Sequence, residues 1–257
     1  MKIFLSALES VMYSKDLGGG YFSQFLVEQG LPLKYILMSY YYIQKKTENA
    51  EYIRDHAELV MIDSGAHSFQ KGTKVDWEQY TRNYAEFIKR FDRPNVVGYF
   101  EMDVDGIIGY DKVLELREIL EDVSDKIIPV WHNSRGINDY LEMCKKYAGK
   151  TVAISGFRRM DIQDSQYIMF LKEAKKHNCK LHCLGMTRKK ILDTVPFDYT
   201  DSSTWVQEGI YGMIKNQGRV TKEFSRAHRE VVQLENYKAG VRMQNHYYHK
   251  WKRVCKD

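Results

Sequence analysis

The sequence predicts an α/β protein that folds as a (β/α)8 TIM-like barrel with a basic helical extension at its C-terminus. Three observations predict this fold: eight short apolar or β-branched runs, amphipathic helical stretches between them, and no long linker. The eight strand–helix units fill about 215 residues, which is within the size range of such barrels. We therefore expect a barrel domain over 1–215 and a basic helical extension over 216–257 that packs on the barrel. A doubly wound open sheet is the alternative.

The expected strands are the short apolar runs, and the expected helices lie between them. The strands span Lys2–Leu8, Tyr35–Ile43, Leu59–Ile62, Val96–Met102, Lys126–Trp131, Thr151–Ser155, Lys180–Leu184 and Phe197–Thr200. Between strands, apolar residues such as Tyr80, Tyr84 and Phe87 recur at three- and four-residue steps, as in helices that pack one face on a core. Asp76 and Asp111 each precede such a stretch, so we expect both to cap helices.

A run of glycines interrupts the predicted secondary structure after the first strand, but it does not form a nucleotide-binding motif. Gly18, Gly19 and Gly20 lie in that first connection. They do not match the G-x-G-x-x-G pattern of dinucleotide-binding open sheets, and no P-loop Lys-Ser/Thr follows them. This absence favours the barrel over the open sheet.

Composition excludes several classes of protein. With 44% hydrophobic and 28% charged residues, the chain is ordinary for a folded protein and unlike a disordered one. No apolar run approaches the ~20 residues that span a bilayer, and the first ten residues do not resemble a signal peptide. Four cysteines in 257 residues do not look like a disulfide framework. We expect a cytoplasmic protein with reduced thiols and no membrane partner.

The basic excess lies in the C-terminal sixth of the chain. Residues 215–257 hold 11 Lys and Arg against 4 Asp and Glu, whereas the rest holds 28 against 30. Clustered basic side chains neutralise phosphates, so we expect Lys222, Arg226 and Arg229 to bind nucleic acid. A solvated helix face is the alternative interpretation.

Polar residues follow the expected strands at the end where barrel enzymes carry their active sites. They are Glu9 after the first strand, Asp63 and Ser64 after the third, Asp103 after the fourth, His132 after the fifth, Ser155 and Gly156 at the sixth, His182 within the seventh and Asp201 after the eighth. Carboxylates on separate strands can divide the work of nucleophile and general acid/base. The pattern predicts an active site at this mouth of the barrel.

Neither a metal nor another cofactor is expected. Cys179, His182 and Cys183 are close in sequence, but Cys183 follows His182 directly on a strand, so their side chains point to opposite faces. Cys255 has no partner at ligand spacing. The G-x-S-x-G motif of serine hydrolases is also missing.

Several motifs resemble those of tRNA-guanine transglycosylases and their shorter phage-type relatives, which place 7-deazaguanine bases into DNA. The segment Asp63-Ser64-Gly65-Ala66-His67-Ser68-Phe69-Gln70 resembles the family's DSGGFQ or DSGAFS segment. The other motifs follow in the family's order: Tyr99-Phe100-Glu101-Met102-Asp103, Val130-Trp131-His132-Asn133, Ala153-Ile154-Ser155-Gly156-Phe157, Leu181-His182-Cys183-Leu184-Gly185-Met186 and Asp201-Ser202-Ser203-Thr204-Trp205. The resemblance covers 1–211. The chain lacks the cysteine-rich zinc site of the tRNA enzymes, and His67 replaces the usual Gly or Phe.

The resemblance implies an enzyme that exchanges a base at a glycosidic bond. Asp201 would be the nucleophile at C1′ of a guanosine, and Asp63 would carry protons to and from the bases. Asp103 would accept hydrogen bonds from the guanine edge. The other expected substrate-binding residues are Ser64, His132, Ser155, Gly156 and His182. The expected partners are DNA or tRNA and a free 7-deazaguanine base, and a homodimer stays open.

Two questions stay open at the level of sequence. Asp198 and Asp201 both qualify as nucleophile, because Phe197-Asp198 imitates the Phe-Asp pair of the tRNA enzymes. Asp201 is preferred, since it lies nearer the C-terminal end of its strand. The alternative functions are a non-catalytic nucleic-acid-binding subunit and a nucleoside N-glycosidase.

Overall fold

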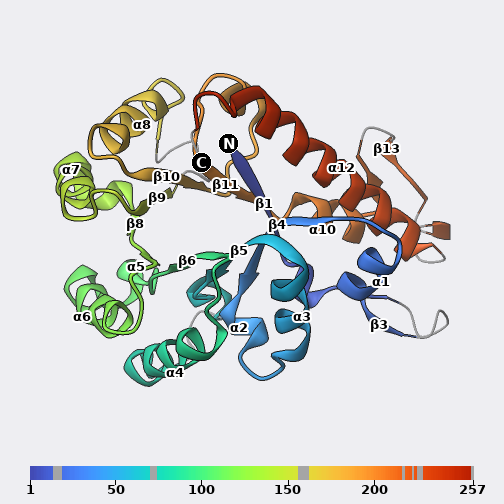
Figure 1. The fold of residues 1–257 in the computed structure, drawn as a ribbon, viewed down its shortest axis with the longest axis horizontal. Helices are drawn as coiled ribbons and strands as arrows, with labels where there is room; N and C mark the ends of the chain where they lie inside the picture. The colour runs from blue at the N-terminus through green and yellow to red at the C-terminus, as the bar shows by residue number, and fades with distance from the viewer. Residues whose placement is uncertain are drawn as a thin grey trace.

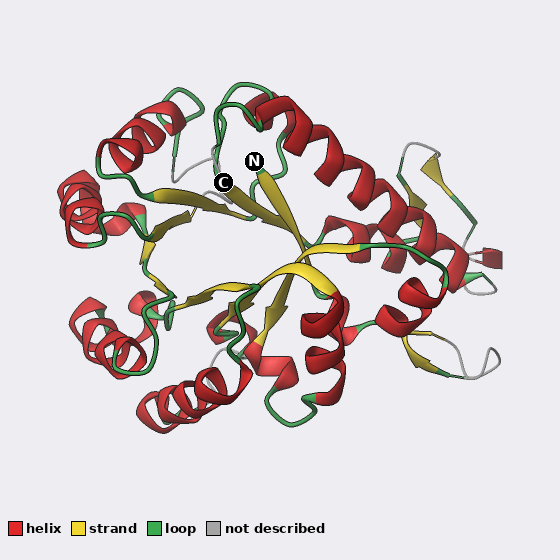
Figure 2. Ribbon diagram, in the orientation of Figure 1, coloured by secondary structure: helices red, strands yellow, loops and turns green. Residues whose placement is uncertain are grey.

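A parallel β-sheet curls into a barrel, and helices form a layer around it (Figure 1, Figure 2). The computed structural model describes residues 1–13, 19–69, 74–155, 162–215, 218–221, 223–224 and 228–255. The sheet has nine strands in the order β7-β6-β5-β4-β1-β11-β10-β9-β8. They are β1 (Lys2–Ser6), β4 (Leu33–Ser39), β5 (Ala57–Asp63), β6 (Val96–Phe100), β7 (Ile127–Ile128), β8 (Val130–Trp131), β9 (Thr151–Ser155), β10 (Lys180–Leu184) and β11 (Tyr199–Ser202).

Pro129 divides the fifth strand position into β7 and β8. Proline has no backbone N–H and cannot donate to a neighbouring strand, although its carbonyl accepts a hydrogen bond from Ala153 N at 2.9 Å. β7 pairs with β6 and β8 pairs with β9, so the two ends of the sheet meet at this single residue. Because β7 and β8 belong to one extended segment, the strands occupy eight positions around the barrel. The predicted barrel with a C-terminal helical extension is confirmed.

Alternation along the strands fills the barrel with apolar side chains. These form one buried cluster of Phe4, Tyr35, Leu37, Met61, Phe100, Ile128, Val130, Ala153 and Tyr199. The barrel is therefore a packed core and not a pore. On five strands the inward position at the C-terminal end is polar, and these side chains line the mouth discussed below: Ser6, Ser39, Asp63, Ser155 and Asp201. Leu184 at the end of β10 is apolar and packs on the core.

Helices lie outside the barrel strands. They are α1 (Phe22–Glu28), α2 (Tyr40–Ile43), α3 (Glu48–His56), α4 (Trp77–Phe91), α5 (Asp105–Ile108), α6 (Tyr110–Glu121), α7 (Gly136–Lys146), α8 (Tyr167–Lys176), α9 (Lys189–Leu192) and α10 (Thr204–Ile210), with the 3-10 turns η1 (Leu8–Ser10), η3 (Ala66–Ser68) and η4 (Asn133–Arg135). The spacing of apolar residues predicts α4, α6, α7 and α8, each of which buries one face. Asp76 caps α4 as predicted, since its carboxylate accepts from Gln79 N at 2.9 Å. The prediction that Asp111 caps a helix was wrong, because α6 already begins at Tyr110.

Six of the eight expected strands have different ends in the structure, and only the sixth and seventh keep the expected bounds. The first stops at Ser6, because Ala7 adopts a left-handed conformation (φ 72°) that turns the chain into η1. The second stops at Ser39, and the following Tyr40–Ile43 forms α2. Tyr40 there stacks on Tyr84 with ring centroids 4.7 Å apart, a tertiary contact that local propensity does not reveal. The eighth begins two residues later than expected and continues to Ser202.

The long helix α12 (Arg229–Trp251) packs across the barrel from outside and contacts β1. Gln244 Nε2 donates hydrogen bonds to the carbonyls of Ile3 at 2.8 Å and Tyr35 at 2.9 Å. Two short hairpins, β2 (Met12–Tyr13) with β3 (Gly20–Tyr21) and β12 (Met213–Ile214) with β13 (Gly218–Arg219), complete the described elements. Within the described ranges, no helix is both long and apolar enough to pass through a bilayer.

Candidate active site

The C-terminal ends of the barrel strands bring the two expected catalytic carboxylates to one mouth. Asp63 is the last residue of β5, and Asp201 lies near the end of β11. The strands β11, β1, β4 and β5 are consecutive neighbours in the sheet. Ser39 of β4 pairs with Asp63, and Phe4 of β1 pairs with Asp201. The two carboxylates therefore lie on the same wall of the mouth, with β1 and β4 between them.

Two donors hold one oxygen of Asp201. His182 Nε2 and Gly185 N each lie 2.9 Å from Oδ1. A carboxylate only accepts hydrogen bonds, so His182 carries its proton on Nε2 in this contact. The other oxygen, Oδ2, lies 3.5 Å from Ser6 Oγ, at the outer limit of a hydrogen bond. Asp201 thus has one fixed oxygen and one weakly engaged oxygen.

His182 supports Asp201 from below the mouth. Its side chain has no exposed surface and lies within about 6.5 Å, between ring centroids, of Phe4, Phe100 and Tyr199. The expected role of His182 was substrate binding. In the structure its ring contacts the carboxylate of Asp201, so a positioning role fits its surroundings better.

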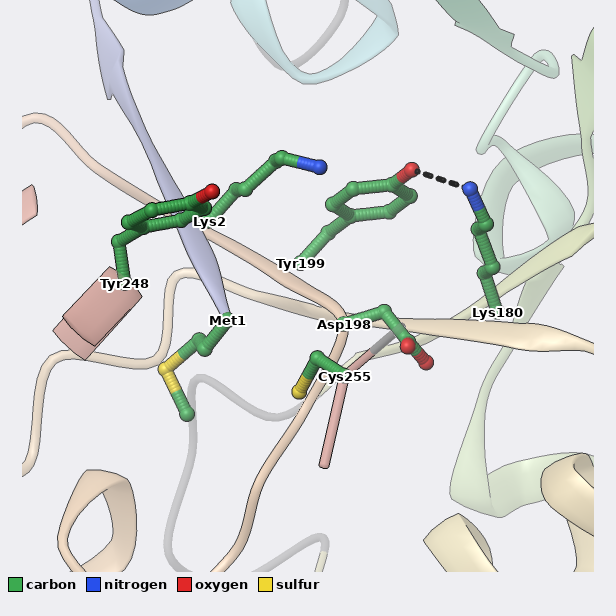
Figure 3. Close-up of a pocket in the computed structure, with 7 residues that line it drawn as sticks. All are labelled: Met1, Lys2, Lys180, Asp198, Tyr199, Tyr248 and Cys255. Carbon is green, nitrogen blue, oxygen red and sulfur yellow. Dashed lines mark hydrogen bonds between the residues drawn. The ribbon is translucent and has the colours of Figure 1, made fainter. Parts of the chain in front are cut away.

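Asp198 lies at the opposite, N-terminal end of the barrel. Its carboxylate bonds to Lys175 Nζ at 2.6 Å and accepts from Leu181 N at 2.8 Å. Figure 3 shows it beside Lys180 and Tyr199, which are joined by a hydrogen bond of 3.2 Å. Both oxygens of Asp198 are engaged, and the side chain is far along the strand from the mouth. Of the two candidates, Asp201 alone lies where the other expected site residues gather.

The Asp63 side of the mouth contains buried polar atoms without partners. Ser64 is fully buried, and its Oγ has no hydrogen-bond partner among the described residues. The same is true of Ser39 Oγ. Gly65 follows with φ 74°, and a Cβ there would lie 2.4 Å from Tyr41 Cβ. The motif needs glycine at this position both for its backbone angle and for the close approach of α2.

Glu9, which follows the first strand, joins this group. Its side chain lies under the mouth, and Oε1 accepts a hydrogen bond from Ser39 N at 3.0 Å. Burial, and to a smaller extent the negative charge of Asp63, raises the pKa of Glu9 to about 7 against the lowering effect of backbone hydrogen bonds. An acidic residue directly after the first strand was the available sequence signal. Its burial was not visible in the sequence.

Asp103 and His132 form a second group at the mouth, contributed by the segments after β6 and β8. His132 Nε2 hydrogen-bonds Asp103 Oδ1 and lies 3.9 Å from Asp105 Oδ1. Burial lowers the pKa of His132, but the hydrogen bond and the two negative charges outweigh it, so the net pKa is raised. The raised pKa favours the imidazolium form relative to an isolated histidine, and the hydrogen bond orients the Asp103 carboxylate.

The same three side chains are the metal-ligand candidate in the described part of the chain. One ligand atom each of Asp103, Asp105 and His132 lies within 4.8 Å of the others. Their hydrogen bond and opposite charges already account for this proximity, so the geometry does not require an ion. The described cysteines are free thiols, and Cys179 Sγ donates to backbone carbonyls, so the sulfur-containing site stays disfavoured.

Of the remaining expected site residues, the structure describes two, Ser155 and Arg229. Ser155 ends β9 and pairs with Leu184 at the same mouth. Arg229 is exposed at the first residue of α12. Gly156, Lys222 and Arg226 lie outside the described residues.

Comparisons of the chain with protein-family models, curated proteins and solved structures find no match.

A separate cavity of about 330 Å³ opens at the N-terminal end of the barrel. Lys126, Lys150 and Lys180 line it together with Val97 and Tyr199. Lys126 is already paired with Asp92 at 2.8 Å. Catalytic groups of barrel enzymes collect at the other end, so this cavity is not assigned to the candidate site.

Proposed function

We propose that the protein is a base-exchanging transglycosylase, which replaces guanine in DNA or tRNA with a 7-deazaguanine. The observation that carries the proposal is the environment of Asp201 at the barrel mouth. Two hydrogen bonds orient one of its oxygens, the other is weakly engaged, and a second carboxylate, Asp63, lies on the same wall. A nucleophile and a separate acid/base are the two groups that substitution at an anomeric carbon with retained configuration needs.

In the proposed reaction, Asp201 Oδ2 attacks C1′ of the target nucleoside and the bond from C1′ to N9 breaks. Asp63 gives a proton to N9 of the departing guanine and so becomes a carboxylate. Asp63 then takes the proton from N9 of the incoming base, whose nitrogen attacks C1′ and displaces Asp201. The two displacements retain configuration, and each proton that Asp63 gives is recovered.

In this proposal, Asp103 would recognise the guanine edge by accepting its hydrogen bonds. A carboxylate accepts from both N1–H and the 2-amino group, which are donors on guanine and on its 7-deaza analogues. The bond to His132 fixes the direction of the carboxylate. Arg229 on α12, together with Lys222 and Arg226 of the same basic segment, would neutralise phosphates of the nucleic acid.

The test measures incorporation of labelled guanine into tRNA, duplex DNA and single-stranded DNA. Exchange in one substrate supports the proposal. Release of guanine without incorporation would identify an N-glycosidase, and tight binding with neither reaction would identify a non-catalytic subunit.

A covalent adduct on denaturing gels tests the nucleophile. We expect the adduct with wild type and Asp198→Asn, but not with Asp201→Asn. An adduct that persists in Asp201→Asn and disappears in a folded Asp198→Asn would reverse the assignment.

A further inference from the structure

The inference concerns the cavity of about 330 Å³ at the N-terminal end of the barrel, which takes no part in the proposed reaction. Lysines begin three neighbouring strand positions there. Lys126 directly precedes β7, Lys150 directly precedes β9, and Lys180 is the first residue of β10. Lys180 N donates to the carbonyl of Lys150 at 3.0 Å, so these two residues lie at the same level of the barrel. All three lysines line the cavity.

Strand alternation turns Lys126 and Lys180 toward the inside of the barrel. Ile128 belongs to the buried cluster that fills the barrel, and His182 packs against a ring of the same cluster. Side chains two residues apart on a strand share a face, so Lys126 and Lys180 lie on this inner face as well. Figure 3 shows Lys180 reaching the hydroxyl of Tyr199, to which its Nζ donates at 3.2 Å. This hydrogen bond holds the ammonium group of Lys180 at the cavity.

The positive charges of the cavity are compensated only in part. Lys126 pairs with Asp92 at 2.8 Å, and Asp125 adds one negative charge to the lining. Among the described residues, no carboxylate forms an ion pair with Lys150 or Lys180. A hollow lined by an excess of one sign of charge raises the local concentration of ions of the opposite sign. The cavity therefore favours an anion.

We propose that this cavity binds a small organic phosphate monoester, whose phosphate group is held by Lys150 and Lys180. Such a phosphate carries nearly two negative charges at neutral pH, which match the two lysines without a carboxylate partner. Lysine binds phosphate as a point charge. Val96, Val97 and Ile127 line the same cavity and offer an apolar wall to the carbon skeleton of the ligand. The volume lies at the lower end for small-molecule sites, which suits a compact ligand. This proposal does not depend on base exchange.

Isothermal titration calorimetry of the full chain with phenyl phosphate tests the site. We expect saturable binding to wild type and about tenfold weaker binding to Lys150→Gln and to Lys180→Gln, because each variant loses one charged hydrogen bond to the phosphate. The control Lys145→Gln removes the same charge from an exposed position on α7 and should bind as wild type does. No saturable binding to wild type, or equal affinity of all four proteins, would overturn the proposal.

Two further ligands test the chemistry of the site, and two further variants test its location. Inorganic phosphate lacks the ring and benzoate carries a single charge, so both should bind more weakly than phenyl phosphate. Equal affinity for either one would contradict the proposed ligand class. Asp201→Asn alters the mouth and Arg229→Ala alters the basic extension, and both should bind phenyl phosphate as wild type does. A loss of binding in either variant would place the anion outside the cavity and overturn the proposal.

Discussion

Replacing Glu9 with glutamine should stabilise the protein at alkaline pH and change its stability little at acidic pH. Burial, and to a smaller extent the charge of Asp63, raises the pKa of Glu9 from 4.5 to about 7 in the folded state. Between these values the folded protein keeps a proton that the unfolded chain has already lost. The free energy of unfolding therefore falls as pH rises through this window and becomes constant above it.

The size of this effect follows from the two pKa values. Each unit of difference corresponds to 1.36 kcal/mol, so ionised Glu9 lowers stability by about 3 kcal/mol, of which roughly 2 to 3 kcal/mol is lost between about pH 5 and pH 8. For a chain of this size, that loss corresponds to about 4–12 °C in Tm. Glutamine keeps an oxygen to accept from Ser39 N and has no ionisation, so the variant should lack this pH dependence.

Urea unfolding of wild type and Glu9→Gln at about pH 5 and about pH 8 measures how the free energy of unfolding of each protein changes with pH. The exposed Glu28→Gln on α1 is the matched control, and it should follow wild type. If the free energies of unfolding of Glu9→Gln and wild type stay parallel across the range, Glu9 is ionised in the folded protein and the reasoning about its burial is wrong.

Three further predictions concern other parts of the structure. Glu101→Ala should cost about 3–5 kcal/mol in urea unfolding, because it leaves the Arg117 guanidinium, 2.5 Å away and 3% exposed, buried without its partner; a loss below about 1 kcal/mol would contradict this. Gly65→Ala should lower the free energy of unfolding by about 1–3 kcal/mol, since φ is 74° and its Cβ would overlap Tyr41; an unchanged Tm would argue against the described turn. Arg229→Ala should reduce the slope of log binding constant against log salt concentration for duplex DNA by up to about 0.9; an unchanged slope would indicate that Arg229 lies on a solvated helix face and contacts no phosphate.

The barrel was predictable from the sequence because its signal is local. Each strand is a short apolar run and each helix carries its own stripe of apolar residues, so the alternation is visible without any tertiary contact. The polar residues after the strands were visible for the same reason. In a parallel barrel all strand ends of one kind meet at one mouth, so the placement of Asp63 and Asp201 followed from the fold class.

Tertiary contacts decided what the local pattern left open. The end of β4 at Ser39 depends on how Tyr40 packs against the rings of α4, and apolar aromatic residues suit a strand equally well. The separation of Asp201 from Asp198 depends on partners contributed by β10 and α8. The protonation of Glu9 depends on its burial beneath segments distant in sequence and on the charge of Asp63. Burial and electrostatic fields are sums over the whole fold, and for that reason only the tertiary structure determines them.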